Sequence, residues 1–599
     1  MNGNKRQGLV KRIISFLAYK PTRRERFVLP ELDDERSYRV PPEERKDLDY
    51  SYPGKSEGAS QEEDKGKTQK PVRASEWNRI KGQKESGDGK DEGSDKISPD
   101  INVSLELIKR ELNIPENIDM IVREFKLAGR VDAFVVFIDG MADRGVINDF
   151  ILRQLMNPAQ FENYNGGCMF QYVSDNVLSV NQAKKLEKYD KAISQVLMGV
   201  TALFIDGCDS CLAIETRGYE KRNIDKPATE AVVRGSQEAF TENLKTSITQ
   251  IRRIIRNKDL IHEFVIIGKN DNSMASVLYI KGIANPAVVK EVKRRLKSIN
   301  TDFIGGDGML EQFIEDHPWM LVPQVLTTER PDRTASHIID GKVAIITEGS
   351  PFAMIVPVSL FSFIHSSEDV FLRWQYGTAM RFLRVAAFFT ALLLPGVYIA
   401  LTNYHLEMLP TDLVIAIAKS REIVPFPSIV EVFLMETSFE LIREAGVRVP
   451  GLIGTTLGII GALILGQAAV AANIVSPIMI IVVAVTGLGN FAIPNYSLAF
   501  GIRILRFFFI ILGGIAGFFG ISAGLVILSA RAVSMKSFGV PFMTPAFPRA
   551  GKSPDIITRF PVWQQEERPE HIQPLNKRRQ PDISRGWVKG EPPGGKGEQ

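Results

Sequence analysis

Long apolar runs in the second half of the chain constrain its fold more than any other feature. Residues 382–401, 451–471 and 502–528 each have about the length, roughly 20 residues, that crosses a bilayer as a helix. Residues before about 350 read instead as soluble protein. A soluble enzyme has no use for several such runs in succession. The pattern predicts an integral membrane protein with a large aqueous domain, which passes something through the membrane or signals across it.

Composition and charge exclude several classes of protein. The net charge of +4 is too small to indicate nucleic-acid binding, and three cysteines do not make a disulfide framework. The basic residues 1–26 suit either a helix on an anionic membrane surface or a disordered tail. Their apolar core is too short for a secretory signal, so we expect the large N-terminal region to be cytoplasmic.

Shifts in composition divide the chain into five parts. Residues 1–100 comprise the basic N-terminus and a disordered linker, rich in Lys, Glu, Asp, Gly and Ser. Strand and helix patterns then alternate, which predicts an α/β cytoplasmic region in two lobes, 101–257 and 258–350. An all-α, multi-span membrane domain is expected at 351–545. A flexible C-terminal tail is expected at 546–599.

Local patterns place several elements within the α/β region. Two apolar runs joined by a Gly/Asp-rich turn predict a β-hairpin at 200–216, and a second hairpin is predicted at 343–357. A long amphipathic helix is predicted at roughly 228–257. The interval 257–262 marks the expected boundary between the lobes.

An acidic segment interrupts the apolar half. On a helical wheel of residues 428–446, Glu436, Glu440 and Glu444 fall within about 80° of one another, and Glu431 lies on the opposite side. One interpretation is an interfacial helix with a solvated acidic face. The other is that these carboxylates face a water-filled path or pair with arginines inside the bundle, since ionisable groups at membrane depth are costly. The candidate arginine partners are Arg421, Arg443 and Arg448.

Two further features of the apolar half leave alternatives open. Small residues within 451–471 favour close helix packing, and the other interpretation is a narrow pore lined by Thr455, Gly458 and Ala462. Basic residues place the starts of the first and last apolar runs on the cytoplasmic side. The basic C-terminal tail then lies outside, unless the proline- and glycine-broken segment 474–500 changes the number of crossings.

Catalytic and metal-binding motifs are weak. Cys208 and Cys211 have C-x-x-C spacing without a second such pair, and Gly305–Leu310 lacks the lysine of a phosphate-binding loop. The six histidines show no paired ligand spacing. We therefore expect no enzymatic activity, no cofactor and no metal.

Several long strings carry a family resemblance. They include ETRGYEKRNIDKPATEAVVRGSQEAFTENLKTSITQIRRII at 215–255, TEGSPFAMIVP at 347–357, REIVPFPSIVEVFLMETSFELIREAGVRVP at 421–450 and IPNYSLAFGIRILRF at 493–507. Together with shorter strings between about 119 and 560, they resemble the A subunits of GerA-type spore germinant receptors. The C-x-x-C pair is not a requirement of that family.

The resemblance implies a setting and an activity. It implies residence in the inner membrane of a bacterial endospore, with a transporter-like B subunit and a lipoprotein C subunit as partners. It also implies self-association, as a pentamer, into a gated ion channel that releases cations when nutrients trigger germination. The alternatives are a non-conducting signalling scaffold and a paralogue that amplifies germination without sensing nutrient. The candidate residues of the ion path are Glu431, Glu436, Glu440, Thr455, Gly458 and Ala462.

Overall fold

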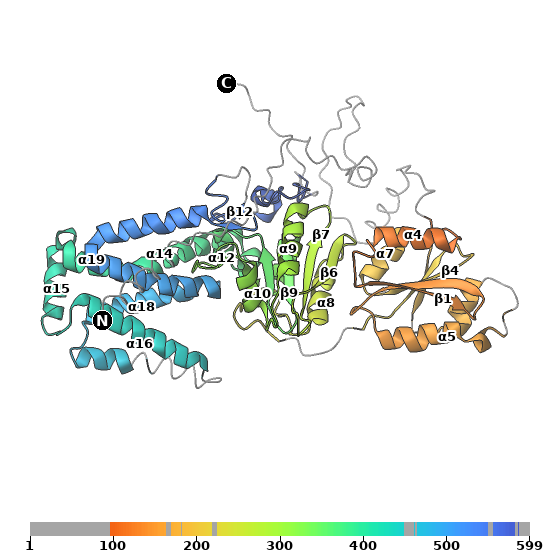
Figure 1. Cartoon of the computed structure of the whole chain (residues 1–599), viewed down its shortest axis with the longest axis horizontal. Coiled ribbons are helices and arrows are strands. Elements are labelled where there is room, and N and C mark those ends of the chain that lie inside the picture. Colours follow the sequence, from red (N-terminus) through yellow and green to blue (C-terminus); the bar gives the residue numbers. More distant parts are fainter. Residues whose placement is uncertain are drawn as a thin grey trace, which may run out of the picture. The chain divides into compact units, whose positions relative to one another are not determined.

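The computed structural model describes residues 96–162, 164, 169–180, 182–218, 225–448, 461, 464–548, 555–581 and 585. These residues form two compact units (Figure 1). One contains the described residues up to 218 together with Arg256–Asp259. The other contains residues 225–255 and the described residues from Leu260 onward. The predicted N-terminal linker at 1–100 lies almost wholly outside the described residues.

The first unit is an antiparallel sheet with helices on both faces. Its strands run in the order β1-β2-β4-β5-β3. One face of β2 packs Phe134 and Val136 under helices α4 (Ile101–Glu111) and α7 (Tyr189–Leu197). The other face packs Val135 under the helical segment from η1 (Val146–Leu152) to α5 (Arg153–Met156). The strands are β1 (Met120–Leu127), β2 (Val131–Ile138), β3 (Ala183–Leu186), β4 (Thr201–Ile205) and β5 (Cys211–Ile214).

The second unit begins with a sheet of the same topology. Its order, β6-β7-β9-β10-β8, repeats the arrangement first, second, fourth, fifth, third. Helices α9 (Pro286–Ser298) and α10 (Asp307–Ile314) cover one face, and α8 (Leu244–Ile254) and α11 (Pro331–Ile339) cover the other. The strands are β6 (Leu260–Ile266), β7 (Met274–Ile280), β8 (Leu326–Thr328), β9 (Val343–Thr347) and β10 (Ala353–Val356). The sequence-predicted hairpins correspond to β4–β5 and β9–β10.

The lobe boundary and the helix predicted before it both differ from expectation. Only residues of α8 are helical within 228–257, because Asn243 caps the helix by accepting from the backbone N–H groups of Lys245 and Thr246. Ile248 and Ile251 of α8 lie in the core of the second sheet. The boundary therefore falls before α8, between 218 and 225, and not at 257/258.

A bundle of helices follows the second sheet within the same unit (Figure 1). Two of its described helices, α14 (Trp374–Tyr404) and α19 (Tyr496–Ser534), are long and apolar enough to cross a membrane, and α18 (Pro477–Phe491) is a shorter apolar helix. Leu326 and Ile355 of the sheet share a core with Ala391 and Phe509 of the bundle. The remaining helices are α12 (Leu360–Ile364), α13 (Glu368–Phe371), α15 (Thr411–Arg421), α16 (Ser428–Arg448) and the helical residues 464–471.

Helix α19 is a hairpin of two antiparallel arms, where the sequence predicted a single span at 502–528. The chain leaves helical geometry at Ala516 and Gly517, and Gly517 has φ +56°. A Cβ at Gly520 would lie 2.3 Å from the Leu512 carbonyl oxygen, a contact that an unbroken helix could not make across eight residues. Arm one, residues 496–515, and arm two, residues 518–534, therefore meet at this turn and both run back toward the lobe (Figure 1).

A side chain from α14 stabilises the turn between the arms. The Tyr404 hydroxyl lies 2.8 Å from the Gly514 carbonyl oxygen and 3.0 Å from that of Ile515. These carbonyls end arm one, where no further helical N–H group can reach them. A glycine fits at 517 because only glycine adopts this backbone conformation without strain.

The hairpin returns the chain to the α/β lobe of the second unit. Gly501 in arm one lies against the Leu321 carbonyl of that lobe. After arm two, the backbone N–H of Val358 donates to the Ser537 hydroxyl at the start of the strand pair β11 (Lys536–Ser537) and β12 (Val540–Pro541). Both ends of α19 therefore lie at the lobe end of the bundle.

Residues 555–581 also pack against this lobe, so a flexible tail does not describe them. Arg559 is buried and donates to the carbonyls of Val370 and Leu372. Arg568 donates to the Ile339 carbonyl, and Ile572 is fully buried. The polar composition that predicted a tail hides these arginine contacts, because each arginine satisfies backbone carbonyls of a distant segment.

Candidate functional site

Charged residues of α16 point into the bundle and meet arginines of α19. Glu436 and Arg506 are both almost completely buried, and their side chains approach to 2.5 Å. Arg506 also donates to Glu440 at 3.3 Å, and Arg503 lies 3.6 Å from the same carboxylate. Arg443, one turn further along α16, donates to Glu440 as well. Each carboxylate in this network has a cationic partner, as charge burial requires.

A second charged pair lies near the end of the bundle farthest from the lobe. Glu431 of α16 is buried and accepts from the backbone N–H of Ser476 at 3.1 Å. Its other carboxylate oxygen lies 3.6 Å from Nε of Arg421, the last residue of α15. Tyr398 of α14 packs in the same core cluster as the residues beside Glu431.

Buried polar atoms without hydrogen-bond partners accompany both charged groups of the bundle. We call the residues that carry them the polar seam, defined by Tyr398, Arg421, Glu431, Glu436, Ser476, Asn490 and Arg506. Each of these residues has a side-chain polar atom that is buried without a hydrogen-bond partner in the described structure. Such atoms are rare in proteins and are usually satisfied by buried water. The seam is therefore the part of the bundle best suited to hold water.

Close helix contacts enclose the seam. A Cβ at Gly513 would lie 2.6 Å from the Gly396 carbonyl oxygen, and one at Gly489 would lie 3.0 Å from that of Ala387. Gly487 gives the same room to the ring of Phe439 on α16. Small residues at these crossings bring the helix backbones together. In this conformation the charges of the seam are thus paired and tightly packed.

The sequence-predicted site residues fall into three groups. Glu431 and Glu436 are buried in the seam, and Glu440 is partly exposed beside Arg443. Glu444 is exposed. Thr455, Gly458 and Ala462 lie outside the described residues. A fully solvated acidic face on α16 is wrong, because the glutamates that share a side with Glu444 meet arginines of another helix.

Sequence reasoning missed Arg503 and Arg506 as partners of these glutamates. It treated them only as markers of the cytoplasmic side. Their signal was the spacing of three residues inside an apolar run, which puts both guanidinium groups on one helical face. A buried arginine in such a run needs a carboxylate, and α16 supplies two.

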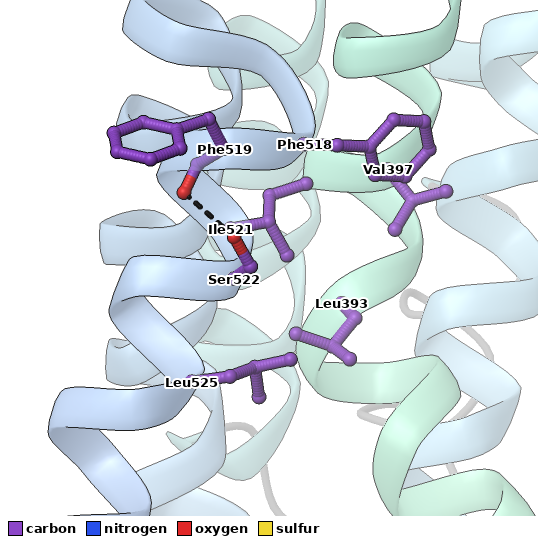
Figure 2. Close-up of a pocket in the computed structure, with 7 residues that line it drawn as sticks. All are labelled: Leu393, Val397, Phe518, Phe519, Ile521, Ser522 and Leu525. Atoms are coloured by element: carbon purple, nitrogen blue, oxygen red, sulfur yellow. Dashed lines mark hydrogen bonds between the residues drawn. The ribbon is translucent and has the colours of Figure 1, made fainter.

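An apolar pocket also opens between α14 and arm two of α19 (Figure 2). Its volume is about 460 Å³. Ser522 provides a hydroxyl, which donates to the Phe519 carbonyl and is therefore satisfied. The pocket offers no charged group to a polar ligand. Its lining residues are Leu393, Val397, Phe518, Phe519, Ile521, Ser522 and Leu525.

Side chains for metal binding are not grouped in the described part of the chain. No three His, Cys, Asp or Glu residues are grouped there as a metal site. Cys211 is buried in β5, and burial raises the pKa of its thiol to about 12. The reactive thiolate form is therefore disfavoured at Cys211.

Known proteins match most of the chain. The family model described as "Bacillus/Clostridium GerA spore germination protein" matches residues 106–571. "Spore germination protein KA" of Bacillus subtilis (strain 168) is 39% identical over 502 residues, which cover 82% of this chain and 91% of that protein. "Uncharacterized membrane protein YfkQ" of the same strain is 35% identical, with 79% of this chain and 91% of that protein covered.

A solved structure is also similar. It is the crystal structure of the N-terminal domain of the A subunit of the Bacillus megaterium spore germinant receptor GerK3, 28% identical, with a TM-score of 0.34. The match covers 44% of this chain and 96% of that one. From the family model and the long relatives, this chain belongs to the Bacillus/Clostridium GerA spore germination protein family.

Proposed function

We propose that this chain is the A subunit of a nutrient-responsive germinant receptor in the spore inner membrane, and that it forms a gated path for cations. The polar seam carries this proposal, because two buried carboxylates and several buried polar atoms without hydrogen-bond partners lie within the helical bundle. In the proposal, a transporter-like B subunit binds the nutrient and a lipoprotein C subunit completes the receptor. The chain itself self-associates, as a pentamer.

The directions of the helices support a multi-pass arrangement. Arms one and two of α19 run in opposite directions and begin and end at the lobe. Residues 496–515 span about 30 Å at 1.5 Å per residue, which matches the hydrocarbon thickness of a bilayer. We infer that both arms cross the membrane. The C-terminal residues then lie on the same, cytoplasmic, side as the α/β region.

In this proposal, the arginines that pair with the buried glutamates hold the path closed. In this conformation Arg506 neutralises Glu436 and Arg421 lies beside Glu431. Opening then requires α16 to move against α19, so that the carboxylates exchange guanidinium partners for water and passing cations. Carboxylates that line a water-filled path favour cations over anions.

A second candidate function is a non-conducting scaffold that relays nutrient binding from its partner. The same arginine pairing favours this candidate, because fully paired charges stabilise a packed bundle without conduction. A paralogue that amplifies germination without sensing a nutrient is compatible with both the channel and the scaffold.

Cation release from vesicles separates the two functions. The full wild-type chain and the Arg506→Met variant are reconstituted separately in potassium-loaded liposomes. Arg506→Met leaves Glu436 without its cationic partner. We expect Arg506→Met to raise potassium release, Glu436→Gln with Arg506→Met to lower it again, and Glu444→Gln to match the wild type. Equal release from all variants and from protein-free vesicles would overturn the channel proposal.

Cysteine accessibility gives a readout that does not depend on those variants. Single cysteines are placed along 455–466, with the native cysteines replaced by serine. Reactivity with a water-soluble thiol reagent that rises on activation supports the channel. A stripe that stays unreactive with and without activation supports the scaffold.

A further inference from the structure

The α/β lobe of the second unit exposes a group of large apolar side chains around α10. We call it the α10 patch, and it consists of Phe303, Met309, Phe313, Trp319 and Leu321. Each is exposed by more than two fifths, and Phe303, Phe313 and Trp319 by more than half. Soluble surfaces rarely gather so many large apolar groups without a binding partner.

Local structure explains why these residues face outward together. Helix α10 buries Leu310 and Ile314 in the sheet core, so Met309 and Phe313, which are four residues apart, share its outer face. The Met309 sulfur accepts from the backbone N–H of Gly305. A Cβ at Gly305 would lie 2.8 Å from the ring of Phe303, so this ring lies beside the start of the helix.

The patch continues into the helical bundle. Met320 and Val322, which flank Leu321, pack into the core that α14 and α19 share with the sheet. The Leu321 carbonyl lies against Gly501 near the start of α19. Helix α10 itself contacts β10, a strand that contributes to the same core, and lies toward the bundle in Figure 1. The α10 patch thus lies at the level where the apolar helices begin.

Chemistry at this level resembles a membrane–water interface. Tyr496 and Phe500, at the start of arm one, are exposed and lie under the guanidinium group of Arg503. Tryptophan and tyrosine concentrate where headgroups meet acyl chains, because one end of each ring system is apolar and the other is polar. Trp319 lies on the lobe side of the same boundary.

Charged groups beside the patch are largely compensated. Asp316 pairs with Arg295, and Asp307 accepts from the Ser350 hydroxyl. Burial raises the pKa of Glu311 to about 8, with Glu315 and Asp307 adding to the effect, and burial raises the pKa of Glu315 to about 7. Near neutral pH, Glu311 is therefore largely uncharged, which reduces the negative charge that anionic lipids would repel.

We propose that the α10 patch inserts into the headgroup–acyl boundary of the phospholipid bilayer and holds the second lobe against the membrane. The occupant is lipid, since the patch is continuous with the bundle surface and carries interfacial aromatic residues. A second copy of the chain or the first unit covering the patch are the competing outcomes. The inference rests on the proposed membrane placement of the bundle.

Depth-dependent quenching of tryptophan emission tests the proposal. The full chain is reconstituted in vesicles of phosphatidylcholine and phosphatidylglycerol, brominated either near the headgroup or near the methyl end of the acyl chains. One variant keeps Trp319 and replaces the other four tryptophans with phenylalanine. We expect the shallow bromines to quench Trp319 more strongly than the deep ones.

Two control variants replace all five native tryptophans and add one elsewhere. Val526→Trp lies on the exposed apolar surface at the middle of arm two and should be quenched by the deep bromines. Ile266→Trp lies on β6, the edge strand at the opposite side of the same sheet from β8, and should not be quenched. In the Trp319 background, Met309→Glu with Phe313→Glu should weaken the shallow quenching.

The outcomes separate this inference from the proposed function. If Val526→Trp is quenched and Trp319 is not, the bundle is in the membrane and the patch is covered by protein, which overturns the inference alone. If Val526→Trp is also unquenched, the membrane placement itself fails. Should the single-tryptophan chain not fold, the lipid quenching lost on Trp319→Phe in the otherwise native chain decides the same question.

Discussion

Removing the buried carboxylate of Glu436 tests whether the seam charges depend on one another. Glu436→Gln leaves Arg506 almost fully buried, with Glu440 at 3.3 Å as its remaining partner. Breaking a buried pair from one side costs about 3–5 kcal/mol, because an uncompensated charge is left behind. Because Glu440 remains as a partner for Arg506, we expect the loss of stability to lie near the lower end of this range.

The partner variant and the double variant complete a thermodynamic cycle. Arg506→Met removes the charge from the other side and leaves an apolar chain of similar length. We expect each single variant to be strongly destabilised, and the double variant to be less destabilised than the sum of the two. Glu444→Gln, at an exposed residue further along α16, is the matched control and should stay within about 0.5 kcal/mol of the wild type.

Denaturant titration of the purified chain in mixed micelles measures these differences. Thermal unfolding of the same samples provides a second ranking if the transition is irreversible. The reasoning is refuted if Glu436→Gln and Arg506→Met cost no more than Glu444→Gln. It is also refuted if the two losses add without coupling, since a pair at 2.5 Å must be coupled.

Three further predictions concern single positions. Gly517→Ala should destabilise more than Gly129→Ala in thermal unfolding. Both glycines have positive φ, and even the left-handed helical region costs a non-glycine residue about 1–2 kcal/mol. Gly517 lies outside that region, with ψ −140°, and only there does the new Cβ meet a side chain, at 2.9 Å. Burial lowers the pKa of His571 to about 3, so between about pH 6.5 and pH 3 only the unfolded chain binds a proton at this residue. The free energy of unfolding should therefore decrease as the pH is lowered through this range, by up to about 1.4 kcal/mol per pH unit. His571→Leu should remove that contribution from an acid titration. Burial, with Glu315 adding repulsion, raises the pKa of Glu311 to about 8. The folded state therefore keeps a proton that the unfolded chain releases above about pH 4.5, and the free energy of unfolding should decrease as the pH rises from about 4.5 to about 8. Glu311→Gln should reduce this pH dependence.

Local patterns in the sequence were enough to predict the two hairpins and the alternation of strands and helices, but not β1, β3 or β8. The runs that form β4, β5, β9 and β10 are short, apolar and bounded by turn residues, and these signals do not depend on distant contacts. The irregular stretch before α8 was read as helix because its fixing contacts are remote in sequence. Glu329 accepts from the backbone N–H groups of Thr229 and Glu230 across about 100 residues.

The hairpin in α19 was hidden for a different reason. Both arms are equally apolar, so the hydrophobic run continues through the turn. Gly517, which allows the turn, is one of several glycines, and its neighbours Gly513, Gly520 and Gly524 instead provide room for close packing. A sequence shows that glycine is present but does not show which glycine has a positive φ.

The hairpin also connects the charged seam to the lobe. Arm one carries Arg506 against Glu436, and both ends of α19 are fixed at the lobe, by Leu321 at the start and by Ser537 after the end. A displacement of α16 against arm one therefore acts on a helix that is held at the lobe by both ends and at the far turn by the Tyr404 hydroxyl, which donates to the carbonyls of Gly514 and Ile515. Because packed helices move as rigid elements, such a displacement would be passed along arm one to its contact with Leu321. Since arm one carries both Arg506 and Gly501, a displacement at the seam is expected to change the contact between Gly501 and the Leu321 carbonyl at the junction of the lobe and the bundle.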